Sequence, residues 1–305
     1  MATQLFSFDS FIDPCWDPVF KSIFTQNTAL SAKARQGLLS AILEQNLKEV
    51  TITANEPPPT RPGDRQIRYD VNCVFDTGEM ANVEMTLYPN IYEPFKLEYY
   101  SGRLFVNQEI RGKDVSYKDL RRSYQISLLA HRKLFKDDSF DHLFVYYDPR
   151  RNISLGGRTA IITLELEKLA LTAEKPVEEM SRKERWGCFF RYFTDKTNRR
   201  LIEDIINQEE AIAMAVEVIE GFSANQIAVF HEISKEKYEL DMRAHRDEAR
   251  EEGRILGWAE GQAKGLEEGR TEGRRETAKN LKEMGLSVDQ IAAATGLAPD
   301  LIKAL

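Results

Sequence analysis

Hydrophobic residues near the start of the chain recur with the period of an α-helix. Between residues 19 and 24 the apolar positions lie three and four residues apart, and Asp17-Pro18 before them is typical of a helix start, with Asp17 as the cap. A second helix is predicted over residues 32–47, which carry a similar apolar face. The proline-rich segment 56–63 then ends regular structure.

The next segments alternate between apolar and polar residues, with the period of a β-strand. Two such runs, 66–75 and 80–88, flank Asp76-Thr77-Gly78, and together they predict an antiparallel hairpin. If Gly78 takes the left-handed conformation in a three-residue loop, Phe75 pairs with Glu79. This register places Asp70 directly opposite Glu84.

The register also decides which side chains share a face. The face of Asp70 and Glu84 is polar, and its other members are Arg68, Asn72, Asn82 and Thr86. The opposite face is expected to pack on a core, because it is apolar almost throughout: Ile67, Tyr69, Val71, Cys73, Phe75, Ala81, Val83, Met85 and Leu87.

Two opposed carboxylates are unfavourable unless something neutralises them. Like charges directly opposite each other destabilise a strand pair, and the repulsion is relieved by a proton or a cation. A hard divalent cation that prefers oxygen ligands, Mg²⁺ or Mn²⁺, would satisfy Asp70 and Glu84. A solvated polar face is the simpler interpretation of an antiparallel hairpin, and the hairpin alone does not choose between the two.

Beyond the hairpin, helices and strands alternate before the chain becomes helical, which indicates an α/β fold. Helix is predicted over 96–110 and over most of 176–245, with a turn at Gly112 between helix and strand. Further strands are predicted at 124–129, 143–147 and 160–166.

After His245 a glycine occurs at every fourth position from Gly253 to Gly273. Each Gly inside a helix costs about 1 kcal/mol relative to Ala, so this charged segment is expected to be helical only through packing or association. A four-residue step drifts slowly around a helix, and the glycines would form a row that another helix can approach closely. A solvated linker helix is slightly favoured over a stalk for a homo-oligomer.

The last 29 residues, 277–305, look like a helix-turn-helix half, with Gly285 and Gly296 at the turns. A DNA-reading helix here would offer only Lys303 as a basic contact, which is poor equipment for reading bases. A packing or partner-binding unit is favoured.

Composition narrows the class of protein. The 305 residues are 42% hydrophobic and 30% charged, as in a folded globular chain. No run approaches the roughly 18 apolar residues of a membrane span, no signal-peptide pattern is present, and three scattered cysteines suit neither a disulfide frame nor a zinc site. We expect a cytoplasmic protein without a membrane partner. The net charge of −7 excludes a uniformly basic nucleic-acid binder but not a nuclease.

Several motifs together resemble one protein family. Tyr69-Asp70-Val71, the hairpin turn and Asn82-Val83-Glu84-Met85-Thr86 look like the core of the PD-(D/E)XK nuclease family transposases, also called recombination-promoting nucleases. The order and spacing of the motifs make the resemblance specific, and it covers essentially the whole chain. Its other parts are 17–24, 98–108 with Gly112 and Tyr117, Glu184-Arg185-Trp186, and the tail from Asp241.

The resemblance implies a restriction-endonuclease-like α/β core, with a mixed sheet flanked by helices, that cuts DNA with Mg²⁺ or Mn²⁺. Asp70 and Glu84 would hold the metal, and the backbone carbonyl of Met85 would complete its inner shell. A metal lowers the pKa of bound water and stabilises charge on phosphate oxygens. The expected parts are the nuclease-like core at 1–175, a helical extension at 176–245, the glycine-repeat tail at 246–276 and the terminal unit at 277–305.

Thr86 departs from the family pattern, which has Lys or Gln at this position. Threonine adds no charge, and losing a preorganised donor typically costs on the order of 10²–10³ in rate. Activity then requires Lys21, Arg68 or Gln108 to reach the site, although Lys21 and Gln108 are more simply explained as solvated positions. Glu44 could face the metal from the second helix, but it fits a surface carboxylate equally well.

Two functions follow from these observations. The first is a metal-dependent DNA endonuclease that contacts phosphates and has little sequence preference, which the retained Asp70 and Glu84 favour. The second is a catalytically impaired protein that binds DNA or a partner and oligomerises through its tail, which Thr86 favours.

Overall fold

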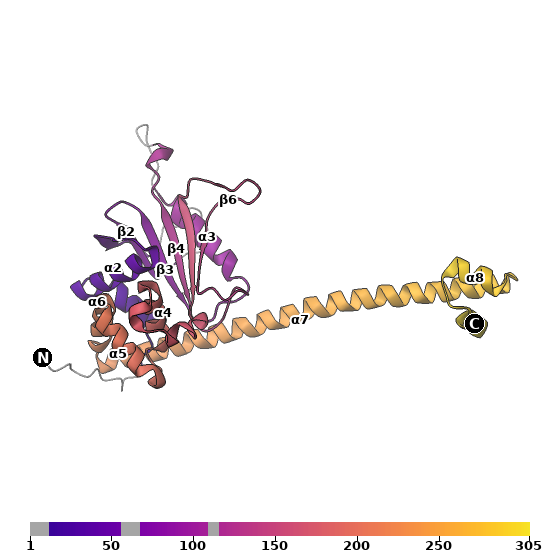
Figure 1. The fold of residues 1–305 in the computed structure, drawn as a ribbon. Helices are drawn as coiled ribbons and strands as arrows, with labels where there is room; N and C mark the ends of the chain where they lie inside the picture. The colour runs from indigo at the N-terminus through magenta and orange to yellow at the C-terminus, as the bar shows by residue number, and fades with distance from the viewer. Residues whose placement is uncertain (1–11, 56–67, 109–115) are drawn as a thin grey trace, which may run out of the picture. The chain divides into compact units, whose positions relative to one another are not determined.

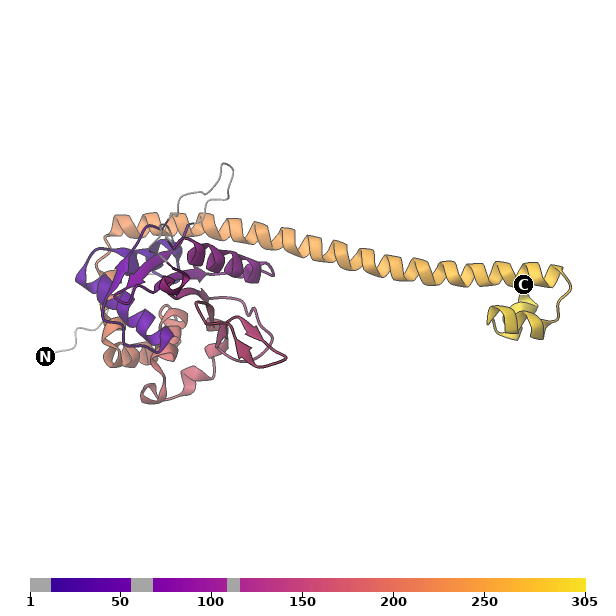
Figure 2. The same cartoon turned by 90° about the horizontal axis from the view of Figure 1, so that it is seen from above.

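The computed structural model of the chain describes residues 12–55, 68–108 and 116–305. They divide into two compact units, Met1–Asp241 and Met242–Leu305. The first unit holds a twisted sheet with helices on its faces, and the second is helical (Figures 1 and 2).

The sheet of the first unit has six strands in the order β1-β2-β3-β4-β8-β5. The central strands β3, β4 and β8 run parallel, and the outer strands are antiparallel to their neighbours. This mixed sheet agrees with the predicted α/β class. The strands are β1 (Val50–Ile52), β2 (Val71–Phe75), β3 (Met80–Thr86), β4 (Ser123–Leu129), β5 (Asp141–Phe144) and β8 (Thr159–Glu165), with β6 (Tyr147–Asp148) and β7 (Ile153–Ser154) as a separate small hairpin.

The predicted register of the β2–β3 hairpin is confirmed. Val71 pairs with Val83 and Val74 with Met80, and Gly78 has a φ of 81°, the left-handed conformation that the turn requires. The apolar face packs into the main core from Val71 onward. Tyr69 is an exception to the predicted face, because it lies before β2 begins and packs on Leu104 instead.

Helices cover both faces of this sheet. The apolar face packs against α1 (Asp17–Thr25), α2 (Ala29–Leu43), α4 (Arg182–Tyr192), α5 (Arg199–Gln208) and α6 (Glu210–Glu220), and α3 (Glu93–Val106) covers the polar face. Trp186 and Phe189 of α4 are fully buried in the same core as Phe20 of α1. The helices of the segment predicted as a helical extension, from residue 176 as far as Asp241, lie in the same compact unit as the sheet.

Several predicted boundaries move. The N-cap of α1 is Trp16, so Asp17 does not cap the helix. Its carboxylate pairs with Lys21 and Lys237 instead. The second helix starts three residues earlier than predicted and ends at Leu43, because Glu44 takes a left-handed conformation with a φ of 54°. The segment 56–63, Ile67 and Gly112 lie outside the described residues.

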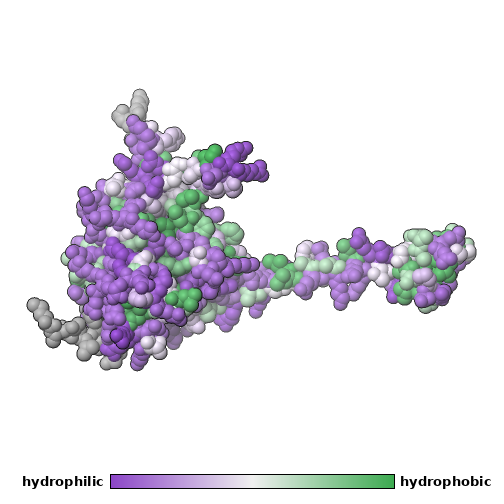
Figure 3. Space-filling model, viewed as in Figure 1, coloured by the Kyte–Doolittle hydropathy of each residue, from purple (hydrophilic) through white to green (hydrophobic). Residues whose placement is uncertain are grey.

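The second unit contains the C-terminal part of α7 (Ala224–Glu283), followed by α8 (Val288–Thr295) and α9 (Pro299–Ala304). Ala278, Ile291 and Ile302 form its small core, with Gly285 and Gly296 in left-handed turns as predicted. The glycines of the tail are helical and exposed, and a Cβ added at any of them would meet no neighbour within 4 Å. Figure 3 shows mainly hydrophilic side chains along this helix, with single apolar ones between them.

Among the described residues, no single helix is long and apolar enough to cross a membrane. The pair α6 and α7, which meet at a bend of 99°, passes that test by length and composition only. The apolar residues of α6, such as Ile212 and Val216, are buried in the core of the first unit. The three cysteines, Cys15, Cys73 and Cys188, are buried and free.

We expect Gly37→Ala to lower the free energy of unfolding by about 1–3 kcal/mol, measured by urea titration, since overpacking a dense core strains its neighbours. The new Cβ would lie 2.1 Å from the Cβ of Ala211, where α2 meets α6. Adding Ala211→Gly should recover part of the loss. Gly102→Ala in α3 is the control, because its Cβ meets nothing within 4 Å and it should be neutral or stabilising. Equal destabilisation by Gly37→Ala and Gly102→Ala would contradict the close approach of α2 and α6.

Candidate active site

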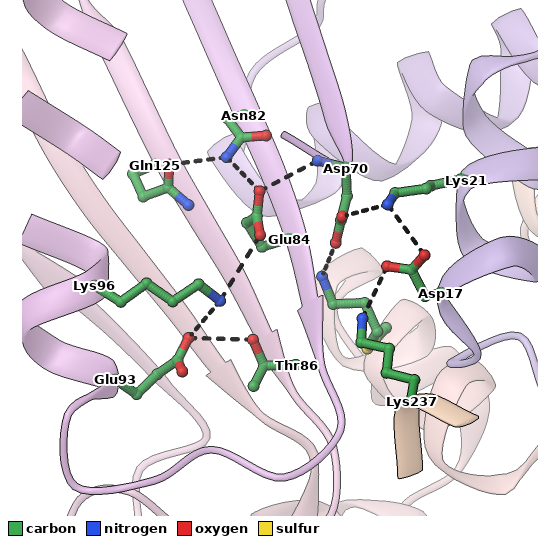
Figure 4. Close-up of polar contacts among 11 residues, drawn as sticks. Asp17, Lys21, Asp70, Asn82, Glu84, Thr86, Glu93, Lys96, Gln125 and Lys237 are labelled. Carbon is green, nitrogen blue, oxygen red and sulfur yellow. Dashed lines mark hydrogen bonds and ion pairs between the residues drawn. The ribbon is translucent and has the colours of Figure 1, made fainter. Parts of the chain in front are cut away.

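Asp70 and Glu84 lie beside each other where β2 begins next to β3 (Figure 4). The backbone N–H of Asp70 donates to Glu84 Oε1 at 3.2 Å, and the backbone N–H of Met85 donates to Asp70 Oδ2 at 3.1 Å. Both residues are nearly inaccessible, with 6% and 4% of their surface exposed. The hairpin therefore holds two buried carboxyl groups in a fixed relation.

A lysine from α1 neutralises Asp70. Lys21 Nζ lies 3.0 Å from Asp70 Oδ1 and 3.0 Å from Asp17 Oδ2, so it bridges the two carboxylates. Lys237 of α7 holds the other oxygen of Asp17 at 2.9 Å. Asp17, which the sequence predicted to cap the helix, instead links Lys237 to Lys21 and through it to Asp70 (Figure 4).

A second lysine, from α3, serves Glu84. Lys96 Nζ lies 3.8 Å from Glu84 Oε2 and 3.2 Å from Glu93 Oε1. The hydroxyl of Thr86 donates to the same oxygen of Glu93 at 3.2 Å. Glu93 therefore connects Lys96 to Thr86, and the ammonium group lies between Glu84 and the position where the family pattern expects a longer side chain (Figure 4).

Burial and mutual repulsion oppose the ionisation of the two carboxyl groups. Burial, and then the neighbouring Asp70, raise the pKa of Glu84 to about 7, and burial raises the pKa of Asp70 despite Lys21. Burial lowers the pKa of both lysines, but the neighbouring carboxylates outweigh this effect. Asp70 and Asp17 raise the pKa of Lys21, and Glu93 and Glu84 raise that of Lys96. The site therefore favours the charged form of the two lysines and disfavours the charged form of the two carboxyl groups.

The polar face continues from Glu84 into a buried layer under α3. Asn82 Nδ2 donates to Glu84 Oε1 at 2.9 Å and to Gln125 Oε1 at 3.0 Å, so two amides extend the site into β4. Ser127 and Thr163 are also fully buried on this side. Within the described residues, Asn82 Oδ1 and Gln125 Nε2 have no hydrogen-bond partner. Apolar side chains would pack under α3 without the cost of burying polar groups. The buried polar layer is therefore better explained by a site that binds polar groups.

Of the accessory residues named from the sequence, some lie at the site and others do not. Lys21 reaches the site, although a solvated position was the simpler interpretation. Gln108 does not: its amide donates to the carbonyl of Arg121 and accepts from the N–H of the same residue, which ties the end of α3 to the start of β4. Arg68 is exposed beside Tyr69.

Glu44 also lies elsewhere. It pairs with Lys183, which also holds Asp141 on β5, the edge strand that β4 and β8 separate from β3. The interpretation as a surface carboxylate was therefore the right one, and Glu44 does not face Asp70 and Glu84.

Four charged residues of the network around the site were missed as candidates: Asp17, Glu93, Lys96 and Lys237. Glu93 and Lys96 are spaced as an i, i+3 ion pair, which was a usable signal in the sequence. Nothing local points to Lys237, which reaches Asp17 across a sequence separation of 220 residues.

In a comparison with protein-family models, residues 14–249 match the family described as PD-(D/E)XK nuclease family transposase. This range contains every residue of the site described above. A search of curated proteins and a search of solved structures found no match to the chain.

In metal-free protein, Glu84→Gln should raise the melting temperature at pH 8. Glu84 ionises near pH 7 when folded and near 4.5 when unfolded, so its charge destabilises the fold progressively as the pH rises from 4.5 through 7. The amide keeps the acceptor for Asn82 and Asp70 without the charge. The gap between variant and wild type, measured by thermal denaturation in EDTA, should close towards pH 4.5. The exposed carboxylate Glu239, changed to Gln, should show no such trend, and a gap that widens at low pH would contradict the assignment.

Proposed function

The chain belongs to the PD-(D/E)XK nuclease family transposases, and from that premise we propose that it is a metal-dependent DNA endonuclease with its active site at Asp70 and Glu84. One observation carries the proposal. Two buried carboxyl groups lie side by side on the hairpin, joined through the backbone of Asp70, and each has a lysine beside it. Purely structural positions rarely gather so many ionisable groups out of water.

The donor set at the hairpin fits a hard divalent cation such as Mg²⁺ or Mn²⁺. Asp70 and Glu84 offer carboxylate oxygens. Burial raises the pKa of each despite the nearby lysines, and a bound cation would favour the ionised forms. The described residues contain no group of three or more His, Cys, Asp and Glu side chains able to hold a metal ion. Two carboxylates are sufficient for Mg²⁺, which usually keeps several waters and binds substrate phosphate, and the carbonyl of Met85 would add a third oxygen.

Such a cation supplies two things when bound: a water of lowered pKa, and positive charge for the phosphate oxygens. The chain's own residues do the rest. Asn82 and the N–H of Asp70 fix Glu84 Oε1, and the N–H of Met85 fixes Asp70 Oδ2, so both carboxylates are oriented before substrate arrives. Lys21 is able to leave Asp70 for a phosphate oxygen, because Asp17 remains as its second partner.

Lys96 provides the charge that Thr86 cannot. Its ammonium lies beside Glu84 and shares Glu93 Oε1 with the Thr86 hydroxyl, so the positive group comes from α3 instead of from β3. We therefore assign to Lys96 the stabilisation of negative charge at the scissile phosphate, with Thr86 and Glu93 as the residues that position it. Contacts of this kind go to phosphates, and they support a nuclease with little sequence preference.

Wild-type protein should nick supercoiled plasmid with Mg²⁺ or Mn²⁺ and not in EDTA, and Asp70→Asn should abolish cleavage, because it removes a metal ligand and the partner of Lys21. Agarose gels of plasmid topology give the readout. Glu44→Gln is the matched control, since this carboxylate contacts Lys183 and should leave the rate unchanged. If wild type binds DNA but leaves plasmid uncut with both metals, the impaired, DNA-binding alternative is preferred.

Lys96→Met should lower the cleavage rate by about 10²–10³, the usual effect of losing a preorganised positive donor. Adding Thr86→Lys to Lys96→Met should recover at least about tenfold, because the longer side chain returns an ammonium near Glu93. Lys133→Met, at an exposed position, should have no effect. A normal rate for Lys96→Met would refute the role of Lys96 without touching that of Asp70.

A further inference from the structure

The outer face of α3 carries three large rings that the core does not use. Tyr92 at its N-cap, Phe95 and Tyr99 lie three and four residues apart, and they are 50%, 65% and 48% exposed. Single exposed apolar residues are ordinary, but here the rings of Tyr92 and Phe95 lie 6.3 Å apart between centroids, and Tyr99 follows about one turn later on the same face of the helix. We call these three residues the aromatic stripe.

The stripe is continuous with the candidate active site. Tyr99 contacts Tyr100 at 6.5 Å between ring centroids, and Tyr100 meets Tyr69 edge to face at 5.8 Å. Tyr69 is the residue directly before Asp70, and its buried hydroxyl has no hydrogen-bond partner among the described residues. Rings therefore lead from the surface of α3 to the backbone of Asp70.

Lys96 lies on the side of α3 between the stripe and Glu84. Its ammonium is 5.5 Å from the ring of Tyr100 and 3.8 Å from Glu84 Oε2, so a cation borders the rings where they approach the carboxylates. Leu97 and Leu104 are almost fully buried and Glu93 is paired, which fixes the helix on the sheet. The rings are thus held on a rigid support instead of a loop.

These features favour one occupant, the bases of a DNA strand. Tyr92 to Tyr99 covers about 10 Å of helix, the length of about three stacked nucleotides. In a duplex the base faces are covered by their neighbours, so the rings would meet only sugar and phosphate, whereas unpaired bases offer their faces for stacking. A phosphate at Asp70 and Glu84, with Lys21 and Lys96 beside it, would place the adjoining nucleotides next to the stripe.

We propose that Tyr92, Phe95 and Tyr99 form a stacking platform for unpaired bases next to the scissile phosphate, so that the substrate is single-stranded or locally melted DNA. This proposal rests on the proposed nuclease function and specifies its substrate class. It also gives α3 two roles, since one side of the helix supplies Lys96 and its outer face holds the strand.

The test measures binding without cleavage. Full-length protein in EDTA is titrated into a fluorescein-labelled 20-nucleotide strand of mixed sequence, and separately into the corresponding duplex, with fluorescence anisotropy as the signal. Phe95→Ala and Tyr99→Ala should each weaken single-strand binding by about 5- to 150-fold, the range for losing one stacked base, and change duplex binding by less than about twofold. Phe95→Trp should retain affinity, and Leu171→Ala, an exposed leucine outside the stripe, should have no effect.

Three outcomes would overturn the platform: no measurable single-strand binding by wild type, unchanged affinity in both alanine variants, or equal losses on single strand and duplex. Sedimentation of the same variants tests self-association. If the alanines dissociate an oligomer and leave single-strand binding intact, the stripe is an interface between copies of this chain and the proposal is wrong. If the alanine variants lose single-strand binding but wild type leaves plasmid uncut, the nuclease function is refuted and the platform is retained.

Discussion

Two carboxyl groups held side by side away from water are the constraint that the rest of this structure answers. Removing an ionised carboxylate from water is costly, and a second one beside it raises the cost. The hairpin brings Asp70 next to Glu84, because Val71 pairs with Val83 and the backbone N–H of Asp70, directly before β2, donates to Glu84 Oε1. The chain must supply positive charge there or lose stability.

It does so from three helices that are far apart in sequence. Lys21 comes from α1, Lys96 from α3 and Lys237 from α7. Asp17 is a second carboxylate partner of Lys21 and Glu93 is one of Lys96, while Lys237 pairs with Asp17. Lys21 and Lys96 therefore each have two carboxylate partners, and Asp17 has two lysine partners. Such an arrangement tolerates the removal of one contact, which is what a site needs if a lysine is to exchange a carboxylate for a substrate phosphate.

The sequence predicted what depends on local pattern and missed what depends on tertiary packing. The turn at Gly78 and the alternation on both sides of it are local, so the hairpin, its register and the proximity of Asp70 to Glu84 could be predicted from the sequence. The assignment of Tyr69 to the core face failed because alternation holds only inside a strand, and β2 starts at Val71. No local rule places Lys237 against Asp17. Gln108, an accessory candidate for which a solvated position was preferred, does not reach the site because its amide satisfies the backbone of Arg121.

Thr86 illustrates the limit of judging a site by the residue at one position. A threonine in place of lysine suggests an impaired enzyme if charge has to come from β3. An electrostatic site, however, requires positive potential at a point in space, and the point beside Glu84 is reached equally from a strand or from the helix that lies over it. Thr86 donates to Glu93, and Glu93 holds Lys96, so the short hydroxyl leaves room for the ammonium and helps to fix the residue that carries it. A lysine at position 86 with Lys96 unchanged would instead place two ammonium groups around one carboxylate oxygen of Glu93. The departure from the family pattern at Thr86 and the presence of Lys96 on α3 are therefore best understood as one arrangement, in which α3 supplies the charge and β3 supplies the space for it.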